Sequence, residues 1–298
     1  MNCKEFLIKN QKIKVEEFEN SVSSNPKVSV LIQTYNHKEF IEKCIDGVLH
    51  QKTNFDYEII LGEDESNDGT REICKQYAQN YPDKIRLFLH HRENNFKINK
   101  KPSGRFVKIH SIFHAKAKYI ALCDGDDYWT DPCKLQKQVD FLERNSDFSM
   151  CVHNAWIENH SDGTKKLFRE KKLKETLRVR DIILIPWFSP TASFLFRREN
   201  FIFPNWDNVN GDMQILFVNA TLGLIHYDST PMSVYNLFTS GSMSSERKTD
   251  YKNMLGKKMS LLNEFNKYTR YNYIVYITIK KVGVFLKYLI RILLDKLK

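Results

Sequence analysis

The chain has 298 residues, of which 42% are hydrophobic and 13% aromatic, and its formal net charge is +10. This composition excludes a disordered chain, because it supplies enough apolar surface for a substantial core. The charge is uneven: residues 251–298 carry a net charge of +9, whereas residues 1–250 carry +1. A nucleic-acid-binding domain is basic along its binding face, so we expect no nucleic-acid partner.

The first half of the chain is predicted to alternate between strands and helices. Short apolar runs bounded by turn residues predict strands, and apolar residues at helical spacing predict helices. In chain order these elements are strand 28–34, helix 39–51, strand 57–61, helix 70–80, strand 85–89, helix 105–117 and strand 119–123. Strands that alternate with helices indicate a parallel sheet covered on both faces.

The second half continues this pattern and ends in a basic helical region. Its expected elements are helix 132–145, strand 149–157, strand 193–197, helix 211–222, short strands near 224–228 and 232–237, and helical structure from about residue 250. The basic connector 163–180 lies between two of these elements. Within it, we expect residues 165–180, which hold eight Lys/Arg and two Glu, to be a solvated loop or helix face and not a nucleic-acid patch.

The cysteines and the first residues indicate a cytoplasmic protein. The six cysteines include no C-x-x-C pair, so we expect reduced thiols and no zinc site. Lysines and glutamates interrupt residues 1–25, which therefore lack the apolar core of a signal peptide. No apolar segment approaches the ~20 residues that a transmembrane helix needs.

Two acidic turns, Glu63–Glu65 and Asp124–Asp127, directly follow predicted strands. In open parallel sheets, ligands bind at the carboxyl ends of the strands. Carboxylates this close together repel one another, so we expect a bound cation to compensate their charge. Oxygen ligands on a loop suit Mg²⁺ or Mn²⁺ shared with the phosphates of a substrate. Asp68 and Asp131, in contrast, are expected to cap helices.

Four motifs occur in a fixed order along the chain. They are Val28–Asn36, Glu58–Thr70, Tyr119–Trp129, and Gly211-Asp212 at the start of a helix. This succession resembles the inverting glycosyltransferases of family 2, which have the GT-A fold. The four motifs together make the resemblance specific, although each alone is a loose signal.

The resemblance implies an α/β fold of the GT-A (Rossmann-like) type, with a mostly parallel sheet flanked by helices and a C-terminal helical extension. It divides the chain into an N-terminal leader, 1–26, a GT-A glycosyltransferase domain, 27–245, and a basic amphipathic helical region, 246–298.

The resemblance also implies that three residues contact the nucleotide. Thr34 and Tyr35, at the end of the first strand, would flank the nucleotide, with the Tyr35 ring packed on the base. Asp64 would accept a hydrogen bond from a base N–H, which favours a uridine nucleotide. Glu63 stands where Asp is commoner in the family.

Three further acids are implied in the transfer step. Asp126 would be the direct ligand of a divalent cation, Mn²⁺ or Mg²⁺, and Asp124 would lie nearer the ribose or the sugar. Asp212 would be the catalytic base, and Gly211 precedes it where many family members have Glu. A helix cap is the alternative role of Asp212, and only the family pattern places the base first.

The implied reaction moves a sugar from a nucleotide-diphosphate sugar, a UDP-sugar in particular, to a hydroxyl of a saccharide or lipid-linked saccharide. Two other functions stay open: a nucleotide-sugar-binding module that is non-catalytic or regulatory, and a D-x-D phosphatase. Phosphatases of the haloacid dehalogenase type have Thr or Val two residues after the second Asp, where this chain has Tyr128. A sugar-phosphate nucleotidyltransferase has a Gly-rich basic phosphate loop, which Gln33–Asn36 does not supply.

Several other residues have structural roles as their simplest interpretation. His110 and His114 are four apart on a predicted helix, but no Glu lies between them and no third metal ligand is in view. We expect surface or packing histidines at both positions. Trp187, Phe188 and Trp206 either stack on a sugar or belong to the core.

Residues 274–298 form a predicted amphipathic helix. Its apolar stripe consists of Val282, Phe285, Leu286, Leu289, Leu293 and Leu297, and a second stripe carries Lys280, Lys287, Arg291, Asp295 and Lys298. Such a helix either lies in a membrane interface or docks on its own domain or a partner. Peripheral contact with the inner face of the cell membrane would suit a lipid-linked acceptor and the assembly of a cell-envelope polysaccharide.

Overall fold

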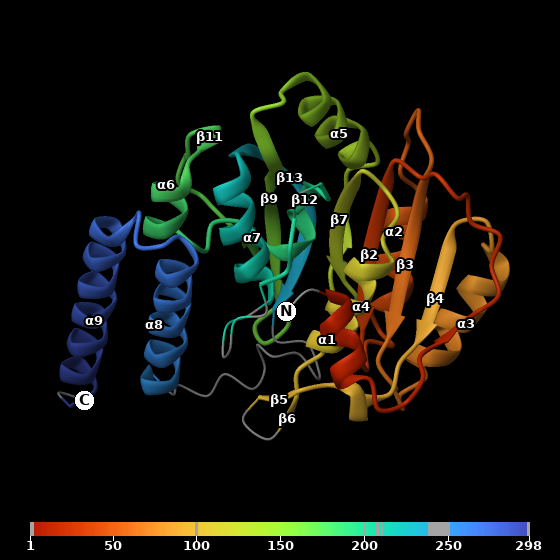
Figure 1. Ribbon diagram of the computed structural model, residues 1–298, viewed down its shortest axis with the longest axis horizontal. Coiled ribbons are helices and arrows are strands. Elements are labelled where there is room, and N and C mark those ends of the chain that lie inside the picture. Colours follow the sequence, from red (N-terminus) through yellow and green to blue (C-terminus); the bar gives the residue numbers. More distant parts are fainter. Residues whose placement is uncertain are drawn as a thin grey trace.

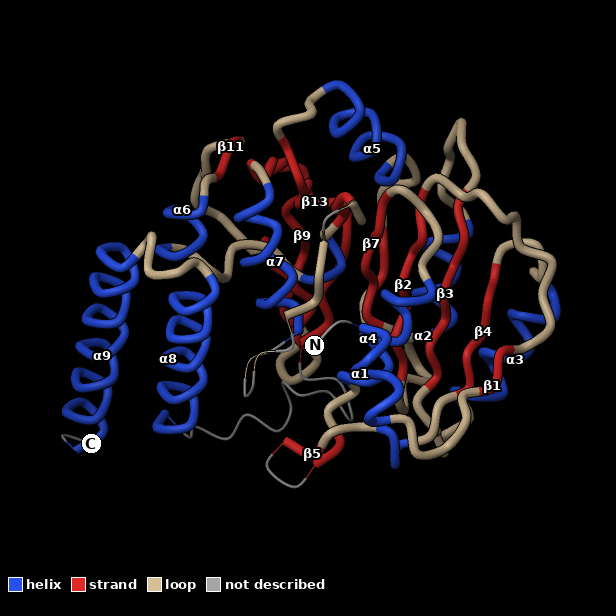
Figure 2. The backbone as a smooth tube through the Cα atoms, viewed as in Figure 1, coloured by secondary structure: helices blue, strands red, loops and turns tan. Residues whose placement is uncertain are grey.

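The computed structural model describes residues 3–98, 101–199, 201–204, 206, 209, 211–237 and 251–296. A large sheet crosses the molecule, and helices cover both of its faces (Figure 1). Figure 2 shows the strands of the large sheet as one layer between the helices, with β5 apart from it.

Four parallel strands form the first half of the sheet. They are β2 (Val28–Thr34), β3 (Tyr57–Glu63), β4 (Ile85–Leu89) and β7 (Tyr119–Asp124), joined by α2 (Ile41–Leu49), α3 (Thr70–Asn80) and α4 (Arg105–His114). Their spatial order is β4-β3-β2-β7, so β2 lies between β3 and β7. The predicted elements of this half are confirmed, and helix 70–80 and strand 85–89 have the expected bounds.

The second half of the sheet mixes parallel and antiparallel pairs. Its main elements are α5 (Lys134–Arg144), β9 (Phe148–Asn159), β12 (Leu195–Arg197), α7 (Gly211–Leu222) and β13 (Leu224–Leu237). Strand β12 is antiparallel to both β7 and β9, and β13 is parallel to β9. The expected helices 132–145 and 211–222 are both present.

Short strands extend the sheet at several places. β1 (Glu16–Glu17) pairs with β4, β8 (Tyr128–Trp129) pairs with β13, β10 (Thr164–Leu167) pairs with β9, and β11 (Thr176–Leu177) pairs with β13. A separate ribbon consists of β5 (Lys97–Ile98) and β6 (Lys101–Pro102). Short 3₁₀ helices cover Arg92–Asn94 and Thr191–Ser193.

The prediction that residues 165–180 of the connector 163–180 are entirely loop or helix face was wrong, because this stretch contains strand residues. The connector begins with β10, which forms a hairpin with β9, continues through β11, and enters α6 (Val179–Leu184). The hairpin turns at Gly163, whose φ of 70° only glycine adopts at no steric cost. The Asp162 carboxylate accepts a hydrogen bond from the Thr164 backbone N–H at 2.9 Å and stabilises this turn.

The two short strands expected at 224–228 and 232–237 are one strand, β13. Its register against β9 shifts between Asp228 and Pro231 and again between Pro231 and Val234. Proline donates no ladder hydrogen bond and so locally interrupts the pattern. The sequence signal of a break was therefore real, but it marks an irregularity within a strand.

Each face of the sheet has its own apolar core. On one face, Val30, Ile32 and other strand residues pack against buried residues of α2, α3 and α5. On the opposite face, Leu31, Leu122 and their neighbours pack against α4, α6, α7 and α1 (Cys3–Asn10). This second core also takes in buried residues of the two C-terminal helices, including Phe265 and Ile277.

Those two helices, α8 (Tyr251–Tyr268) and α9 (Ile274–Lys296), lie side by side at one end of the molecule (Figure 1). Among the helices within the described ranges, none combines the length and the apolar character needed to cross a membrane. The cysteines at positions 44, 74, 123, 133 and 151 are free thiols.

Candidate active site

The carboxyl ends of β2, β3 and β7 meet at one edge of the sheet. Thr34 pairs with Glu63, and Gln33 pairs with Asp124. Beyond the strands, the Asp64 backbone N–H donates to the Thr34 carbonyl at 3.0 Å, and the Gly125 N–H donates to the Gln33 carbonyl at 2.8 Å. The acidic turns after β3 and β7 are therefore both tied to the last residues of β2.

Gly125 is required by the close approach of these two segments. A Cβ atom at this position would lie 2.8 Å from the Thr34 side chain and 2.9 Å from the Gln33 carbonyl oxygen. Both contacts are shorter than real carbon atoms tolerate, so the D-x-D turn can reach β2 only with glycine at its centre.

Asp64 lies buried in a network of polar side chains. The Asn95 Nδ2 atom donates to both carboxylate oxygens, at 2.7 and 2.8 Å, and Arg92 Nη1 donates to Oδ2 at 3.0 Å. Burial nevertheless raises the pKa of Asp64 to about 7, while Arg92 and Asn95 act to lower it. Asp64 therefore changes its charge near neutral pH.

Tyr35 completes this group, which we call the Asp64 cluster and which consists of Tyr35, Asp64, Arg92 and Asn95. The Arg92 guanidinium lies 3.5 Å from the centre of the Tyr35 ring, a cation–π contact. The cluster thus combines a flat aromatic face with a carboxylate and two donors at its edge. This is a set of groups that can recognise a planar heterocycle with N–H and carbonyl positions.

The other two acids of the first turn support its conformation. Glu63 is fully buried, with the Arg71 Nε atom 2.9 Å away, and it accepts a hydrogen bond from the Ser66 backbone N–H at 2.7 Å. Glu65 has a φ of 61° and accepts the Arg92 backbone N–H at 2.8 Å. Arg71 and Arg92 lie beside Glu63 and Asp64, so arginine side chains already compensate much of the charge of this turn, where we had expected a cation.

In the second acidic turn, Asp124–Asp127, one carboxylate is buried and two are partly exposed. Asp127 is buried and accepts a hydrogen bond from the Asn236 backbone N–H at 3.0 Å. Burial, and then the charges of Asp126 and Asp124, raise the pKa of Asp127. The side chains of Asp124 and Asp126 are 37% and 17% exposed, so both can reach a ligand outside the sheet.

His37 and Lys108 lie beside these two exposed carboxylates. His37 Nε2 lies 3.9 Å from Asp126 Oδ2, and its Nδ1 atom lies 3.3 Å from the Thr34 hydroxyl. Lys108, on α4, places its Nζ atom 4.0 Å from Asp124 Oδ1. The buried Thr34 side chain is thereby linked to the D-x-D turn and does not point into the Asp64 cluster.

The donor set suits an open metal site and not a closed one. Throughout the described part of the chain, no three His, Cys, Asp or Glu side chains are grouped so that they could hold a metal ion. Mg²⁺ and Mn²⁺, however, need only one or two carboxylates when water and substrate phosphates complete the coordination. Asp124 and Asp126 fit this second arrangement.

Asp212 lies in the first turn of α7, near the same edge of the sheet. Burial raises its pKa, the charge of Lys108 lowers it, and the charge of Asp124 raises it. The Lys108 side chain also passes close to α7, because a Cβ atom on Gly211 would lie 3.2 Å from Lys108 Cδ. The structure therefore brings Asp212 and Asp124 into one electrostatic environment, with Lys108 acting on both.

The family model for Glycosyl transferase family 2 matches residues 29–202, more than half of the chain. The chain belongs to glycosyl transferase family 2. The matched segment contains the Asp64 cluster and the D-x-D turn and ends before Asp212.

This family 2 glycosyltransferase aligns with only part of the length of two curated relatives. An uncharacterized protein of Mycobacterium tuberculosis is 35% identical over 183 residues, which are 61% of this chain and 49% of that protein. TuaG of Bacillus subtilis, provisionally named a teichuronic acid biosynthesis glycosyltransferase, is 34% identical over 140 residues, 47% of this chain and 50% of TuaG. The chain spans about half the length of these two relatives.

Solved structures share the fold at low sequence identity. S. aureus TarS 1–349 in complex with UDP-GlcNAc has a TM-score of 0.53 and 15% identity, covering 88% of this chain and 80% of that one. The mannosyltransferase PcManGT of Pyrobaculum calidifontis, in complex with GDP-Man and Mn²⁺, has a TM-score of 0.51 and 18% identity, covering 90% and 70%. The expected GT-A-type α/β fold is confirmed.

Other sequence expectations for this glycosyltransferase concern residues outside the site. Asp68 accepts the Thr70 backbone N–H and Asp131 accepts that of Cys133, so both carboxylates stabilise the turn that leads into a helix. The N-cap positions themselves are Gly69 and Cys133, so the expected capping role is met only in this looser form. His110 is buried among aromatic rings, which confirms a packing role. Phe188 and Trp206 are core residues, and Trp187 is exposed.

Sequence reasoning missed Arg92, Asn95, His37 and Lys108. Arg92 and Asn95 follow β4, whose carboxyl end lies at the same sheet edge as the ends of β2 and β3. The polar stretch Arg-Glu-Asn-Asn, shortly after a buried strand, is the sequence signal by which Arg92 and Asn95 could have been found. Lys108 gave no comparable signal, because its role depends on the tertiary structure that brings its side chain close to Gly211 at the start of α7.

Proposed function

We propose that this family 2 glycosyltransferase transfers a sugar, with inversion, from a nucleotide-diphosphate sugar to a hydroxyl of a saccharide or lipid-linked saccharide. The observation that carries the proposal is the arrangement of two chemically different groups at one sheet edge. The Asp64 cluster suits a nucleobase, and the acids Asp124, Asp126 and Asp212, with Lys108, suit a diphosphate and the reacting sugar.

In this proposal the Asp64 cluster binds the base. The Tyr35 ring supplies a stacking surface, and the Asp64 carboxylate accepts an N–H of the base. Arg92 donates to a base carbonyl while it remains close to Asp64. A uridine nucleotide is the expected donor, because the N3–H of uracil lies between two carbonyl groups, matching a carboxylate beside a guanidinium. TarS, which has been crystallised with UDP-GlcNAc, gives fold-level support only.

Asp212 takes the proton of the attacking hydroxyl. The acceptor oxygen forms a bond to the anomeric carbon, the bond from that carbon to the diphosphate oxygen breaks, and the nucleoside diphosphate leaves from the opposite face. A correctly placed base contributes typically ~10²–10⁴-fold to such a step. Lys108 favours the ionised, proton-accepting form of Asp212, since its charge lowers the Asp212 pKa.

Asp126, with Asp124 beside it, would hold a Mn²⁺ or Mg²⁺ ion. A bound divalent ion supplies charge neutralisation for the departing diphosphate. PcManGT, which has been crystallised with Mn²⁺, supports this part of the proposal.

We further propose a place for the reaction, at the cytoplasmic face of the cell membrane in the assembly of a cell-envelope polysaccharide. Two observations support it: the similarity to TuaG, whose provisional name assigns it to teichuronic acid biosynthesis, and the basic amphipathic region 274–298. Peripheral membrane contact would bring a lipid-linked acceptor to the enzyme.

A panel of sugar nucleotides with Mn²⁺ tests the donor and the reaction separately. A donor at 100 times its dissociation constant should stabilise the protein by about 2.7 kcal/mol, read as a rise in the unfolding temperature. Release of nucleoside diphosphate in the presence of an acceptor then measures turnover. Asp212→Asn should keep the thermal shift and lose transfer at least a hundredfold.

The matched control is Asp228→Asn, an acid of β13 outside the site, which should keep both readouts. If the wild-type protein binds a sugar nucleotide but turns over none of the acceptors offered, it is a non-catalytic binding module. Release of inorganic phosphate from a phosphomonoester would instead assign the D-x-D turn to a phosphatase.

A further inference from the structure

Helix α9 presents a broad apolar face to solvent. Ten apolar side chains of this helix are between 39% and 64% exposed: Ile274, Val275, Ile279, Val282, Phe285, Leu286, Leu289, Ile290, Leu293 and Leu294. At 3.6 residues per turn they cover an arc of about 200°. An apolar stripe that packs against a single neighbour is typically ~100° wide. One helix alone would leave much of this face exposed.

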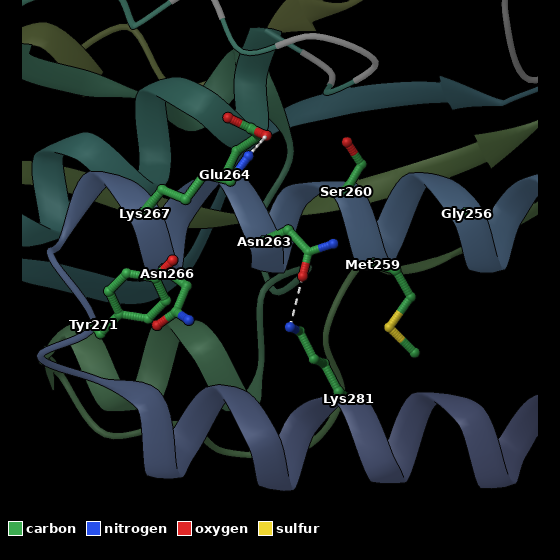
Figure 3. Close-up of a pocket in the computed structure, with 9 residues that line it drawn as sticks. All are labelled: Gly256, Met259, Ser260, Asn263, Glu264, Asn266, Lys267, Tyr271 and Lys281. Atoms are coloured by element: carbon green, nitrogen blue, oxygen red, sulfur yellow. Dashed lines mark hydrogen bonds and ion pairs between the residues drawn. The ribbon is translucent and has the colours of Figure 1, made fainter.

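The apolar face is not the side by which α9 attaches to the molecule. Ile277 alone among the described α9 side chains is fully buried. Lys281 Nζ donates to Asn263 Oδ1 on α8 at 2.6 Å, a contact drawn in Figure 3, and Lys280 Nζ donates to the Leu184 carbonyl at 2.6 Å. A hollow of about 430 Å³, lined largely by polar side chains, separates the two helices at this point. The α9 helix is thus attached through Ile277 in the core and through these lysine contacts, and its apolar face lies outside.

Basic residues border this face on both sides. By helical spacing, Lys280, Lys287 and Arg291 follow one edge of the apolar arc, and Lys281 lies at the other edge. Helix α9 contains five basic residues and one acidic residue. Its neighbour α8 adds further lysines, so the whole region 251–298 carries a net charge of +9.

We propose that the outer face of α9 binds the surface of an anionic phospholipid membrane, with the helix axis parallel to the membrane plane. The width of the apolar arc fits acyl chains, which cover a face without the shape limits of a partner helix. The bordering lysines and arginine attract anionic headgroups but would repel the same residues of a second copy. The charged residues within 23 positions prevent α9 from spanning the bilayer. This inference extends the proposed membrane contact and does not depend on the transfer reaction.

Sedimentation of the full chain with vesicles tests the apolar face. We expect binding to vesicles of phosphatidylglycerol and phosphatidylcholine, and at least a tenfold weaker partition for the double variant Leu286→Glu/Leu293→Glu. The matched control is Ile8→Glu/Ile202→Glu, which adds the same two charges at exposed apolar positions elsewhere and should bind like the wild type. Circular dichroism melting confirms that each variant is folded.

A second pair of variants tests the charge. Lys287→Glu/Arg291→Glu should weaken binding to the anionic vesicles at least tenfold, because each basic residue near the surface contributes about fivefold. The control Lys171→Glu/Lys172→Glu makes the same charge change on the exposed connector and should stay within about twofold of the wild type.

Two results would overturn the proposal. One is equal vesicle binding by the wild type and Leu286→Glu/Leu293→Glu. The other is self-association of the lipid-free wild type, seen by light scattering and abolished in that variant, without any binding to vesicles. The second result would assign the face to another copy of the chain. Neither result bears on the thermal shift with sugar nucleotides, so this proposal and the proposed reaction can fail independently.

Discussion

The carboxyl group of Asp64 is held by opposing influences. Arg92 and Asn95 stabilise its charged form, whereas burial destabilises it more strongly and raises its pKa to about 7. The base-binding role proposed for Asp64 requires the charged form, because a protonated carboxyl presents a donor as well as an acceptor. Nucleotide binding should therefore depend on pH near neutrality.

We expect the affinity for the sugar nucleotide to rise about tenfold from pH 6 to pH 8, as the ionised fraction of Asp64 increases. Titration calorimetry at several pH values measures this change. Asp64→Asn should bind more weakly and show a flat profile over the same range. Equal wild-type affinity at pH 6 and pH 8 would contradict the role of Asp64.

Lys108 is expected to act as a positioning residue through Asp212. In Lys108→Met the pKa of Asp212 should rise, because the cation that lowers it is gone. The acidic limb of the kcat/KM profile should then move to higher pH, and a shift of about one unit would lower kcat/KM about tenfold along that limb.

The matched variant Lys116→Met removes an exposed lysine just beyond the same helix and should leave the profile in place. A lower rate in Lys108→Met with an unmoved profile would mean that Lys108 supports the fold and does not tune Asp212.

At the scale of elements, α4 and the end of β4 enclose three histidines. The ring centres of His90 and His110 lie 4.7 Å apart, and those of His110 and His114 lie 4.1 Å apart. Burial lowers the pKa of His90 to about 3 and that of His110 to about 2, and it also lowers the pKa of His114. The folded protein therefore holds these rings neutral.

A histidine whose pKa in the folded protein lies below its unfolded value of about 6.5 does not lower the free energy of unfolding above that pH. Below that pH the unfolded chain binds a proton that the folded protein does not, so the free energy of unfolding falls with the pH. Each buried ring should cost about 1.4 kcal/mol per pH unit below 6.5. His110→Phe removes one such ring. Its free energy of unfolding should fall less steeply from pH 6.5 to pH 5.5 than that of the wild type, by about 1 kcal/mol.

Urea unfolding at pH 7.5, 6.5 and 5.5 provides the comparison. His50→Phe, at an exposed position on the other side of the sheet, should keep the wild-type slope. If the free energies of unfolding of the wild type and His110→Phe change in parallel with pH, His110 does not take up a proton on unfolding.

The sequence predicted those elements whose burial follows from a local pattern. Strand 28–34 and helix 211–222 are mainly apolar and matched the structure directly. The hairpin of β10 was missed because its residues are exposed and lysine-rich, so only the Asp162-Gly163 turn marked it. Within the site, Asp64 and Asp124 could be placed by their position after strands. Lys108 could not, because its role arises from the tertiary approach of its side chain to the start of α7.

At the scale of the whole molecule, the C-terminal helices are connected to the site through the core. Phe265 of α8 is buried, and its ring centre lies 4.7 Å from that of Phe217 on α7, the helix whose first turn carries Asp212. Trp206 and Tyr273 also contact Phe265. Helix α8 therefore supports the position of α7 through this aromatic contact.

Phe265→Ala should lower the free energy of unfolding by about 3–5 kcal/mol, the usual cost of removing a buried aromatic ring. Chemical denaturation of the lipid-free protein measures this loss. Phe285→Ala, on the exposed face of α9, should cost about 0.5 kcal/mol or less in the same experiment. Similar losses for the two variants would show that α8 is not part of the core.

One consequence follows from the central strand, β2. Its Thr34 carbonyl bonds the turn that carries Asp64, and its Gln33 carbonyl bonds the turn that carries Asp124. The residues proposed to bind the base therefore lie on the β3 and β4 side of this strand, and those proposed to act on the diphosphate and the sugar lie on the β7 side. Exchanging the loops after β3 and β4 for those of another member should alter nucleotide preference while the sugar and acceptor stay the same, so the two specificities can be engineered, and can evolve, one at a time.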